Sequence, residues 1–322
     1  MTLPLFFANQ VPADSGLIAA RVTSDGKAEF WLTGTKAKLG IVDGKQRALG
    51  IAARPVVGDW VLAEDREDRA IIHRVLDRKT KLIRKAAGRE GAPQVIAANI
   101  DVIFIVTSAN EDLNVRRLER YLALVHDSGA RPVVVINKID LAADAKALID
   151  DTAGAMNDVD VIGVSANVDA GADALLSFIA EDESAALIGS SGVGKSSITN
   201  RLLGREAQST ASLMGRDRGR HTTTRRELFV LPNGVTLIDT PGMRELGLGE
   251  VEDGLAATFQ DIDDLATDCR FSDCKHEGDP GCAVEAAAET GALDAERFAS
   301  YRKLKCEVET AKARNARGRR SR

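Results

Sequence analysis

A glycine-rich segment past mid-chain has the composition and spacing of a phosphate-binding loop. The run Gly189-Ser-Ser-Gly-Val-Gly-Lys-Ser fits G-x-x-x-x-G-K-[ST] in full, between an apolar stretch at 185–188 and a helix-like segment from residue 197. Small residues let successive backbone N–H groups converge on phosphate oxygens, and the helix start adds its positive end. Lys195 would neutralise the β- and γ-phosphates, and the Ser196 hydroxyl would bind Mg²⁺. The residues expected to hold a nucleoside triphosphate are Gly189, Ser190, Ser191, Gly192, Val193, Gly194, Lys195, Ser196 and Ser197.

A second motif, N-K-I-D, predicts which base is bound. It follows the apolar run 133–136, at the carboxyl end of an expected strand, where α/β sheets bind ligands. The Asp140 carboxylate can accept hydrogen bonds from the N1–H and the N2 amine of guanine, a donor pair that adenine lacks. Asn137 and Lys138 would shape the pocket, and a backbone N–H of Ser165-Ala166 would contact guanine O6. Taken alone, N-K-x-D also fits a helix N-cap turn.

Two further segments have residues suited to sensing a γ-phosphate. The motif D-T-P-G at 239–242 ends the expected strand 235–238, so Asp239 would reach Mg²⁺ through a water and the Gly242 amide would bond the γ-phosphate. The run Gly219-Arg-His-Thr-Thr-Thr lies upstream, and we expect Thr223 to complete the metal shell, although the sequence does not fix this register. No Gln follows Gly242-Met243, so we expect His221, rather than Arg244, to position the attacking water as a neutral imidazole.

The third kind of chemistry is metal binding. Cys269-x₄-Cys274-x-His276-x₅-Cys282 gathers three of the four cysteines and one of the four histidines of the chain. Three thiolates and an imidazole form a closed tetrahedral shell for one structural Zn²⁺, with no open position for water. The alternative is a set of reduced, unpaired cysteines. Cys306 stands apart, and we expect it only to pack.

These motifs must be positioned by three types of structure. Short strand-like segments with turn residues between them, from about residue 16 to residue 84, predict a small β-barrel of the OB type. Continuous apolar runs that alternate with helical patterns, at 100–106, 132–136, 159–164, 185–189 and 235–239, predict a doubly wound α/β domain. The remainder is helical and alanine-rich. We therefore expect domains at 1–88 (an RNA-binding barrel), 89–255 (nucleotide binding) and 256–322 (zinc-binding helices with a basic tail).

Composition and charge limit the partners. With 44% hydrophobic and 28% charged residues in 322, the chain is expected to be globular, and no apolar run approaches the roughly 18 residues of a membrane span. The first residues lack a secretory signal pattern, so we expect a cytoplasmic protein. The net charge is −5, yet six basic and no acidic residues lie in 312–322, and a second basic cluster surrounds Arg218. Such segments either contact phosphate or form a solvated surface.

The order of the motifs is unusual, because the guanine motif precedes the phosphate loop. In this order the chain resembles the circularly permuted GTPases, specifically the small-ribosomal-subunit-dependent GTPase A (RsgA/YjeQ) family. The resemblance runs from about residue 16 to residue 301 and rests on Pro55-Val-Val-Gly-Asp, on the N-K-I-D, phosphate-loop and D-T-P-G motifs, on 219–224 and on the Cys/His segment. Gly192 stands where an Asn would indicate potassium activation.

The resemblance implies an N-terminal OB-fold barrel, a circularly permuted P-loop GTPase domain and a C-terminal helical zinc-binding domain. It further implies late maturation of the 30S ribosomal subunit, with 16S rRNA as partner, GTP hydrolysis to GDP and phosphate stimulated by that subunit, and His221 as the hydrolytic residue. We expect a monomer. Two other functions remain open: an RNA-binding assembly scaffold with GTP as a structural ligand, and a P-loop ATPase or kinase, which Asp140 disfavours.

Overall fold

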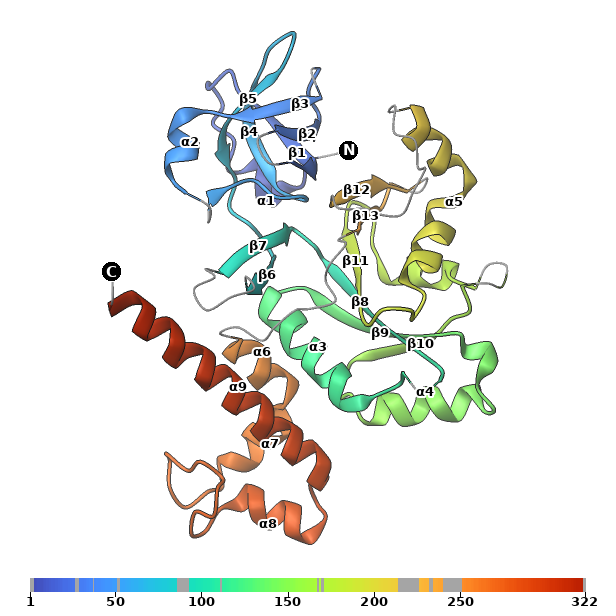
Figure 1. The fold of residues 1–322 in the computed structure, drawn as a ribbon, viewed down its shortest axis with the longest axis vertical. Coiled ribbons are helices and arrows are strands. Elements are labelled where there is room, and N and C mark those ends of the chain that lie inside the picture. The colour runs from blue at the N-terminus through green and yellow to red at the C-terminus, as the bar shows by residue number, and fades with distance from the viewer. Residues whose placement is uncertain are drawn as a thin grey trace.

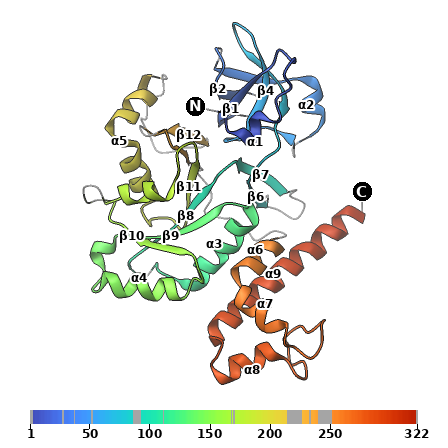
Figure 2. The same cartoon turned by 180° about the vertical axis from the view of Figure 1, so that it is seen from behind.

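A computed structural model describes residues 3–26, 29–36, 38–50, 53–85, 93–110, 112–166, 168, 171–213, 226–231, 234–239 and 251–320 of the chain. Figures 1 and 2 show a barrel at one end, an α/β domain in the middle and a group of helices at the other end. No helix among the described residues has both the length and the apolar character needed to cross a membrane. The three predicted types of structure are therefore present in the predicted order.

The N-terminal unit is a closed five-stranded barrel. Strand β1 pairs with both β2 and β4, and the circle closes through β3 and β5. Side chains from alternate positions fill the interior, with Phe30 and Ile72 almost fully buried among smaller residues. The elements are α1 (Leu5–Ala8), β1 (Ile18–Asp25), β2 (Glu29–Thr33), β3 (Leu39–Val42), α2 (Gly44–Ala48), β4 (Trp60–Asp65) and β5 (Ala70–Val75).

A hairpin of β6 (Lys81–Lys85) and β7 (Pro93–Ala98) leads from the barrel to the α/β domain. The central sheet of that domain has the order β10-β9-β8-β11-β13-β12, parallel except for β12. Its elements are β8 (Val102–Ser108), α3 (Val115–Ser128), β9 (Arg131–Asn137), η2 (Ile139–Leu141), α4 (Ala145–Gly154), β10 (Asp160–Gly163), η3 (Asp173–Phe178), β11 (Ser184–Ile188), α5 (Lys195–Leu213), β12 (Glu227–Val230) and β13 (Thr236–Asp239).

Both faces of this sheet are covered. All seven residues of β8 are buried, as expected for a central parallel strand. Along β8, alternate side chains enter different clusters: Ile103 and Ile105 pack with α3 and the C-terminal helices, whereas Phe104 packs with α5 and η3. Helix α3 begins at an Asn114 cap and ends at Gly129, which has the left-handed conformation that glycine adopts without strain.

The C-terminal unit packs on α3. It consists of α6 (Glu252–Thr258), α7 (Gln260–Ala266), α8 (Ala283–Thr290) and the long α9 (Ala295–Arg320). Helix α6 approaches α3 so closely that a Cβ on Gly254 would lie 1.9 Å from the carbonyl oxygen of Ala123. Val308 and Ala311 of α9 are buried, and the last turns of this helix point away from the body in Figure 1. The basic segment predicted near the C-terminus therefore continues this helix as far as Arg320.

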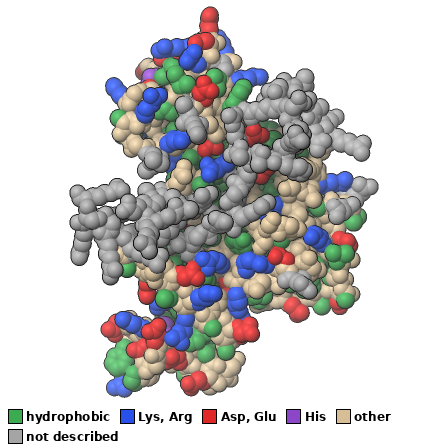
Figure 3. All heavy atoms as spheres, in the orientation of Figure 1, with side chains coloured by type: hydrophobic (Ala, Val, Ile, Leu, Met, Phe, Trp, Pro, Cys, Tyr) green, Lys and Arg blue, Asp and Glu red, His purple; other side chains and the backbone are tan. Residues whose placement is uncertain are grey.

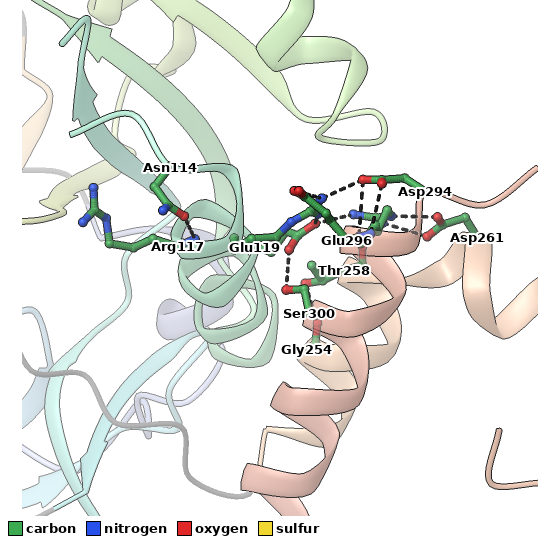
Figure 4. Close-up of polar contacts among 11 residues, drawn as sticks. Asn114, Arg117, Glu119, Gly254, Thr258, Asp261, Asp294, Glu296 and Ser300 are labelled. Atoms are coloured by element: carbon green, nitrogen blue, oxygen red, sulfur yellow. Dashed lines mark hydrogen bonds and ion pairs between the residues drawn. The ribbon is translucent and has the colours of Figure 1, made fainter. Parts of the chain in front are cut away.

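A buried carboxylate joins α3 to these helices, as Figure 4 shows. Glu119 is fully buried and binds Arg297 of α9 at 3.0 Å, Arg116 at 2.7 Å and the Ser300 hydroxyl. Arg297 in turn binds Asp261 of α7 at 2.7 Å. Figure 3 shows both basic and acidic side chains on the lower part of this face of the molecule. Because the carboxylate has three donors, its desolvation cost is offset only while all of them stay in place.

We expect Glu119→Gln to lower the free energy of unfolding by about 1–3 kcal/mol, because an isosteric amide cannot accept from three donors and leaves Arg297 undercompensated. Urea unfolding followed by circular dichroism measures the change. Glu289→Gln is the matched control, since Glu289 is exposed on α8. Equal stabilities of the two variants would contradict a structural role for the buried carboxylate.

Candidate functional site

The glycine-rich segment forms a loop between β11 and α5, as its sequence predicts. Gly189, Gly192 and Gly194 all have positive φ angles. A Cβ on Gly189 would lie 2.1 Å from the carbonyl oxygen of Val106 on β8, and one on Gly194 would lie 2.1 Å from the Asn137 amide nitrogen. Gly189 and Gly194 therefore depend on glycine for both conformation and space, whereas Gly192 has open space and depends on it for conformation alone.

Three polar side chains lie at the point where this loop leads into α5. The Lys195 ammonium donates to the carbonyl oxygens of Gly189, at 2.8 Å, and of Ser190. Ser196 and Ser197, at the start of α5, are exposed to solvent. The lysine thus lies across the loop where phosphates are expected, and the two hydroxyls are accessible at the positive end of the helix.

The guanine motif and the phosphate loop are in direct contact. The Asn137 amide donates to the carbonyl oxygen of Val193 at 2.8 Å, and the Lys138 ammonium donates to that of Gly192 at 3.1 Å. Lys138 has a φ of 58°, which turns the chain sharply at the carboxyl end of β9. Two segments more than 50 residues apart therefore form one site, at the edge of the sheet where the motifs predict it.

Ser165 has a contact that the sequence reasoning missed. Its hydroxyl donates to the Asp140 carboxylate and accepts from the backbone N–H of Asp140 at 3.2 Å. The neighbouring Ala166 N–H donates to the Asn137 amide oxygen at 3.1 Å. The prediction assigned only a backbone donor to this segment, but the hydroxyl also orients the exposed carboxylate expected to read the base. A serine after a strand gives no sequence signal of such a partner.

The residues expected to sense the γ-phosphate are described only in part. Asp239 is half-buried and is the last residue of β13, the strand that pairs with β11. His221, Thr223 and Gly242 lie outside the described residues, as does Arg244. Their roles stay predictions.

The four predicted metal ligands converge. The Nδ1 atom of His276 lies 3.7 Å from the sulfur of Cys269, 3.4 Å from that of Cys274 and 3.3 Å from that of Cys282, and all four ligand atoms lie within 4.8 Å of one another. A tetrahedral ion with Zn–S of about 2.3 Å and Zn–N of about 2.0 Å places nitrogen and sulfur about 3.5 Å apart. The donor set and its spacing therefore fit Zn²⁺.

The surroundings of the cluster shift the protonation of its ligands in opposite directions. Burial lowers the pKa of His276, so the imidazole is neutral at pH 7 and can offer a lone pair. Desolvation raises the pKa of Cys274 to about 12, so this thiol must release a proton when a cation binds. The Ala283 N–H donates to Cys269 and the Glu285 N–H donates to Cys282, each at 3.4 Å, which stabilises thiolates.

Comparisons with known proteins agree with the site. The family model described as RsgA GTPase matches residues 75–249. "Small ribosomal subunit biogenesis GTPase RsgA" of Methanosarcina acetivorans is 46% identical over 90% of this chain and 79% of its own length. "Small ribosomal subunit biogenesis GTPase RsgA 1" of Oceanobacillus iheyensis is 45% identical over 90% of this chain and 85% of its own.

Solved structures share the fold. YjeQ from Thermotoga maritima has a TM-score of 0.67 and 24% sequence identity, and the match covers 91% of this chain and 98% of that one. YloQ, described as a circularly permuted GTPase, has a TM-score of 0.66 and 22% identity over 93% of this chain and 98% of its own. This chain therefore shares its fold with these two structures over more than nine tenths of its length.

We expect Asp140→Asn to weaken GTP binding by about 100-fold or more and to favour xanthosine triphosphate, because an amide can donate to the carbonyl that replaces the guanine amine. Calorimetry with GTP, ATP and xanthosine triphosphate measures this exchange. Asp150→Asn is the control, since Asp150 is an exposed carboxylate on neighbouring α4. Unchanged base preference in Asp140→Asn would contradict the assignment.

We expect Cys274→Ser to lower bound zinc well below one ion per chain and to reduce the melting temperature by about 5 °C or more, because the ion crosslinks α8 and the preceding loop. Metal analysis and thermal unfolding measure the two effects. Cys306→Ser should change neither, since Cys306 is exposed and outside the cluster. A full zinc content in Cys274→Ser would remove this residue from the ligand set.

Proposed function

The chain belongs to the RsgA GTPase family and is a GTP-hydrolysing enzyme, and we propose that it acts on the small ribosomal subunit as a nucleotide-controlled binding and release factor. The observation that carries the proposal is the contact of Asn137 and Lys138 with the phosphate loop. That contact brings the guanine motif, which includes the Asp140 carboxylate, next to the loop expected to bind the triphosphate. We propose that this pocket binds GTP and GDP.

Recognition of GTP is assigned to two groups of atoms. The backbone of 189–194 would surround the phosphates, and Lys195 would exchange its carbonyl partners for phosphate oxygens. Asp140, oriented by the Ser165 hydroxyl, would accept from the guanine edge. Because an adenine would leave a desolvated carboxylate unpaired, this arrangement favours guanine.

Hydrolysis is assigned to residues at the γ-phosphate. Ser196, Thr223 and Asp239 would hold Mg²⁺, which neutralises phosphate charge when bound. The Gly242 N–H would donate to a γ-phosphate oxygen. His221, as a neutral imidazole, would orient a water for in-line attack and accept a proton from it.

The partner is proposed from the relatives and from the fold. Relatives that are 45% and 46% identical over most of the chain are named for small ribosomal subunit biogenesis. An OB-type barrel is suited to RNA, and the basic helix end beyond residue 311 is suited to phosphate. We assign RNA binding to the barrel at 1–88, GTP turnover to 89–255 and zinc-stabilised docking to 256–322. We further propose that the protein acts as a monomer in the cytoplasm, late in 30S maturation.

The central test is GTP turnover titrated with purified 30S subunits. We expect turnover to rise at least about tenfold at saturation, since the partner would order the catalytic segments. We expect His221→Ala to reduce stimulated turnover by about 100-fold while GTP affinity, measured with a fluorescent analogue, stays unchanged. Absence of stimulation in the wild type would favour the alternative, an RNA-binding scaffold with GTP as a structural ligand. Full activity of His221→Ala would remove that residue from the mechanism.

A further inference from the structure

The barrel is bonded directly to the edge of the nucleotide-binding sheet. Ser24 of β1 pairs with Glu227, the first residue of β12, and Glu227 pairs with Asp239, the last residue of β13. These three residues form one row across three strands. The row thus runs from the barrel to the proposed metal-binding aspartate and lies at the phosphate end of the sheet.

Arg21 fixes the middle of the same strand. Its side chain is 3% exposed and donates to the hydroxyls of Ser184 on β11 and Thr236 on β13, and to the carbonyl oxygen of Asn99. Ser184 and Thr236 begin their strands, so this contact lies far from the phosphates. Burial lowers the pKa of Arg21 to about 10, which leaves the guanidinium charged at pH 7. Arg21 therefore anchors the barrel independently of the nucleotide.

Asp25 makes the contact at the phosphate end. Its carboxylate lies 3.2 Å from the guanidinium of Arg226, and the two side chains are 12% and 21% exposed. Arg226 is the residue just before β12, and it follows the threonine run at 222–224 in the sequence. A half-buried ion pair is less screened than a surface pair, so small displacements of Arg226 change its energy.

We propose that Asp25 is a positioning residue of the GTPase site. Through Arg226, it couples the position of the barrel relative to the sheet to the presence of the γ-phosphate. The inference rests on the proposed function, because it takes 221–224 and 239–242 as the γ-phosphate sensors. With β1 anchored at Arg21, a shift at the start of β12 strains or relaxes the Asp25–Arg226 pair. By thermodynamic linkage, RNA that holds the barrel in one position favours the nucleotide state in which the Asp25–Arg226 pair is unstrained.

The two tryptophans of the chain allow a test that needs no ribosome. Trp31 of β2 pairs with Ser24 and is half-buried, whereas Trp60 of β4 pairs with Arg21 and is 4% exposed. Iodide quenching of the full chain therefore reports mainly on Trp31. We expect the quenching constant to differ between GDP and a non-hydrolysable GTP analogue in the wild type, and the difference to disappear in Asp25→Asn. No difference in the wild type overturns the inference.

The functional readout is the ratio of 30S affinities with the GTP analogue and with GDP. We expect Asp25→Asn to reduce this ratio about three- to tenfold, with the circular dichroism spectrum of the folded chain unchanged, and the swap Asp25→Arg with Arg226→Asp to restore it in part. The control is Glu307→Gln, which breaks the more exposed Arg120–Glu307 pair between α3 and α9. If Asp25→Asn has the same ratio of 30S affinities as the wild type, the inference is overturned and the proposed function is left intact. If the ratio in the wild type is one, the proposed switch itself is refuted.

Discussion

The site depends on two hydrogen bonds from the end of β9 to the backbone of the phosphate loop. They run from the side chains of Asn137 and Lys138 to the carbonyl oxygens of Val193 and Gly192, so they hold the loop through its backbone. Because of these bonds, the pocket does not depend on the order in which the two motifs occur along the chain. Since they act across the sheet rather than along the chain, strands β9 and β11 can be reconnected without loss of the pocket, provided that their neighbours stay the same.

Helix α3 transmits this constraint to the C-terminal unit. One face of α3 packs on the sheet, and the other packs on α6 and α9 within one continuous hydrophobic cluster. Glu119 makes the junction specific, because a buried carboxylate tolerates only the arrangement that supplies its donors. The metal cluster is part of the same packing, since Cys282 is buried in that cluster and begins α8. Binding of a metal ion at this cluster would therefore also stabilise the docking of the C-terminal unit.

The sequence predicted the elements whose signals are local. The buried strands β8, β9 and β11 appear as apolar runs, α3 appears as a helical stripe, and the metal ligands converge as their spacing indicates. Strand β3 escaped prediction because Gly40 interrupts it; a Cβ there would lie 2.6 Å from a Leu32 methyl group. The contacts of Arg21 and Ser165 escaped for another reason. Their partners lie up to 215 and 25 residues away, respectively, and no local pattern encodes such a pair.

The pairing of β1 with β12 also affects how the chain folds. The barrel is synthesised first, but the partner of Asp25 is 201 residues further along and a partner of Arg21 is 215 further. Until then β1 has an unsatisfied edge position and a guanidinium that has not yet been buried. Strand β13 must also enter between β11 and β12 before the barrel can dock. In a nascent chain the barrel should therefore be complete before it can dock, and docking must await the synthesis of β13.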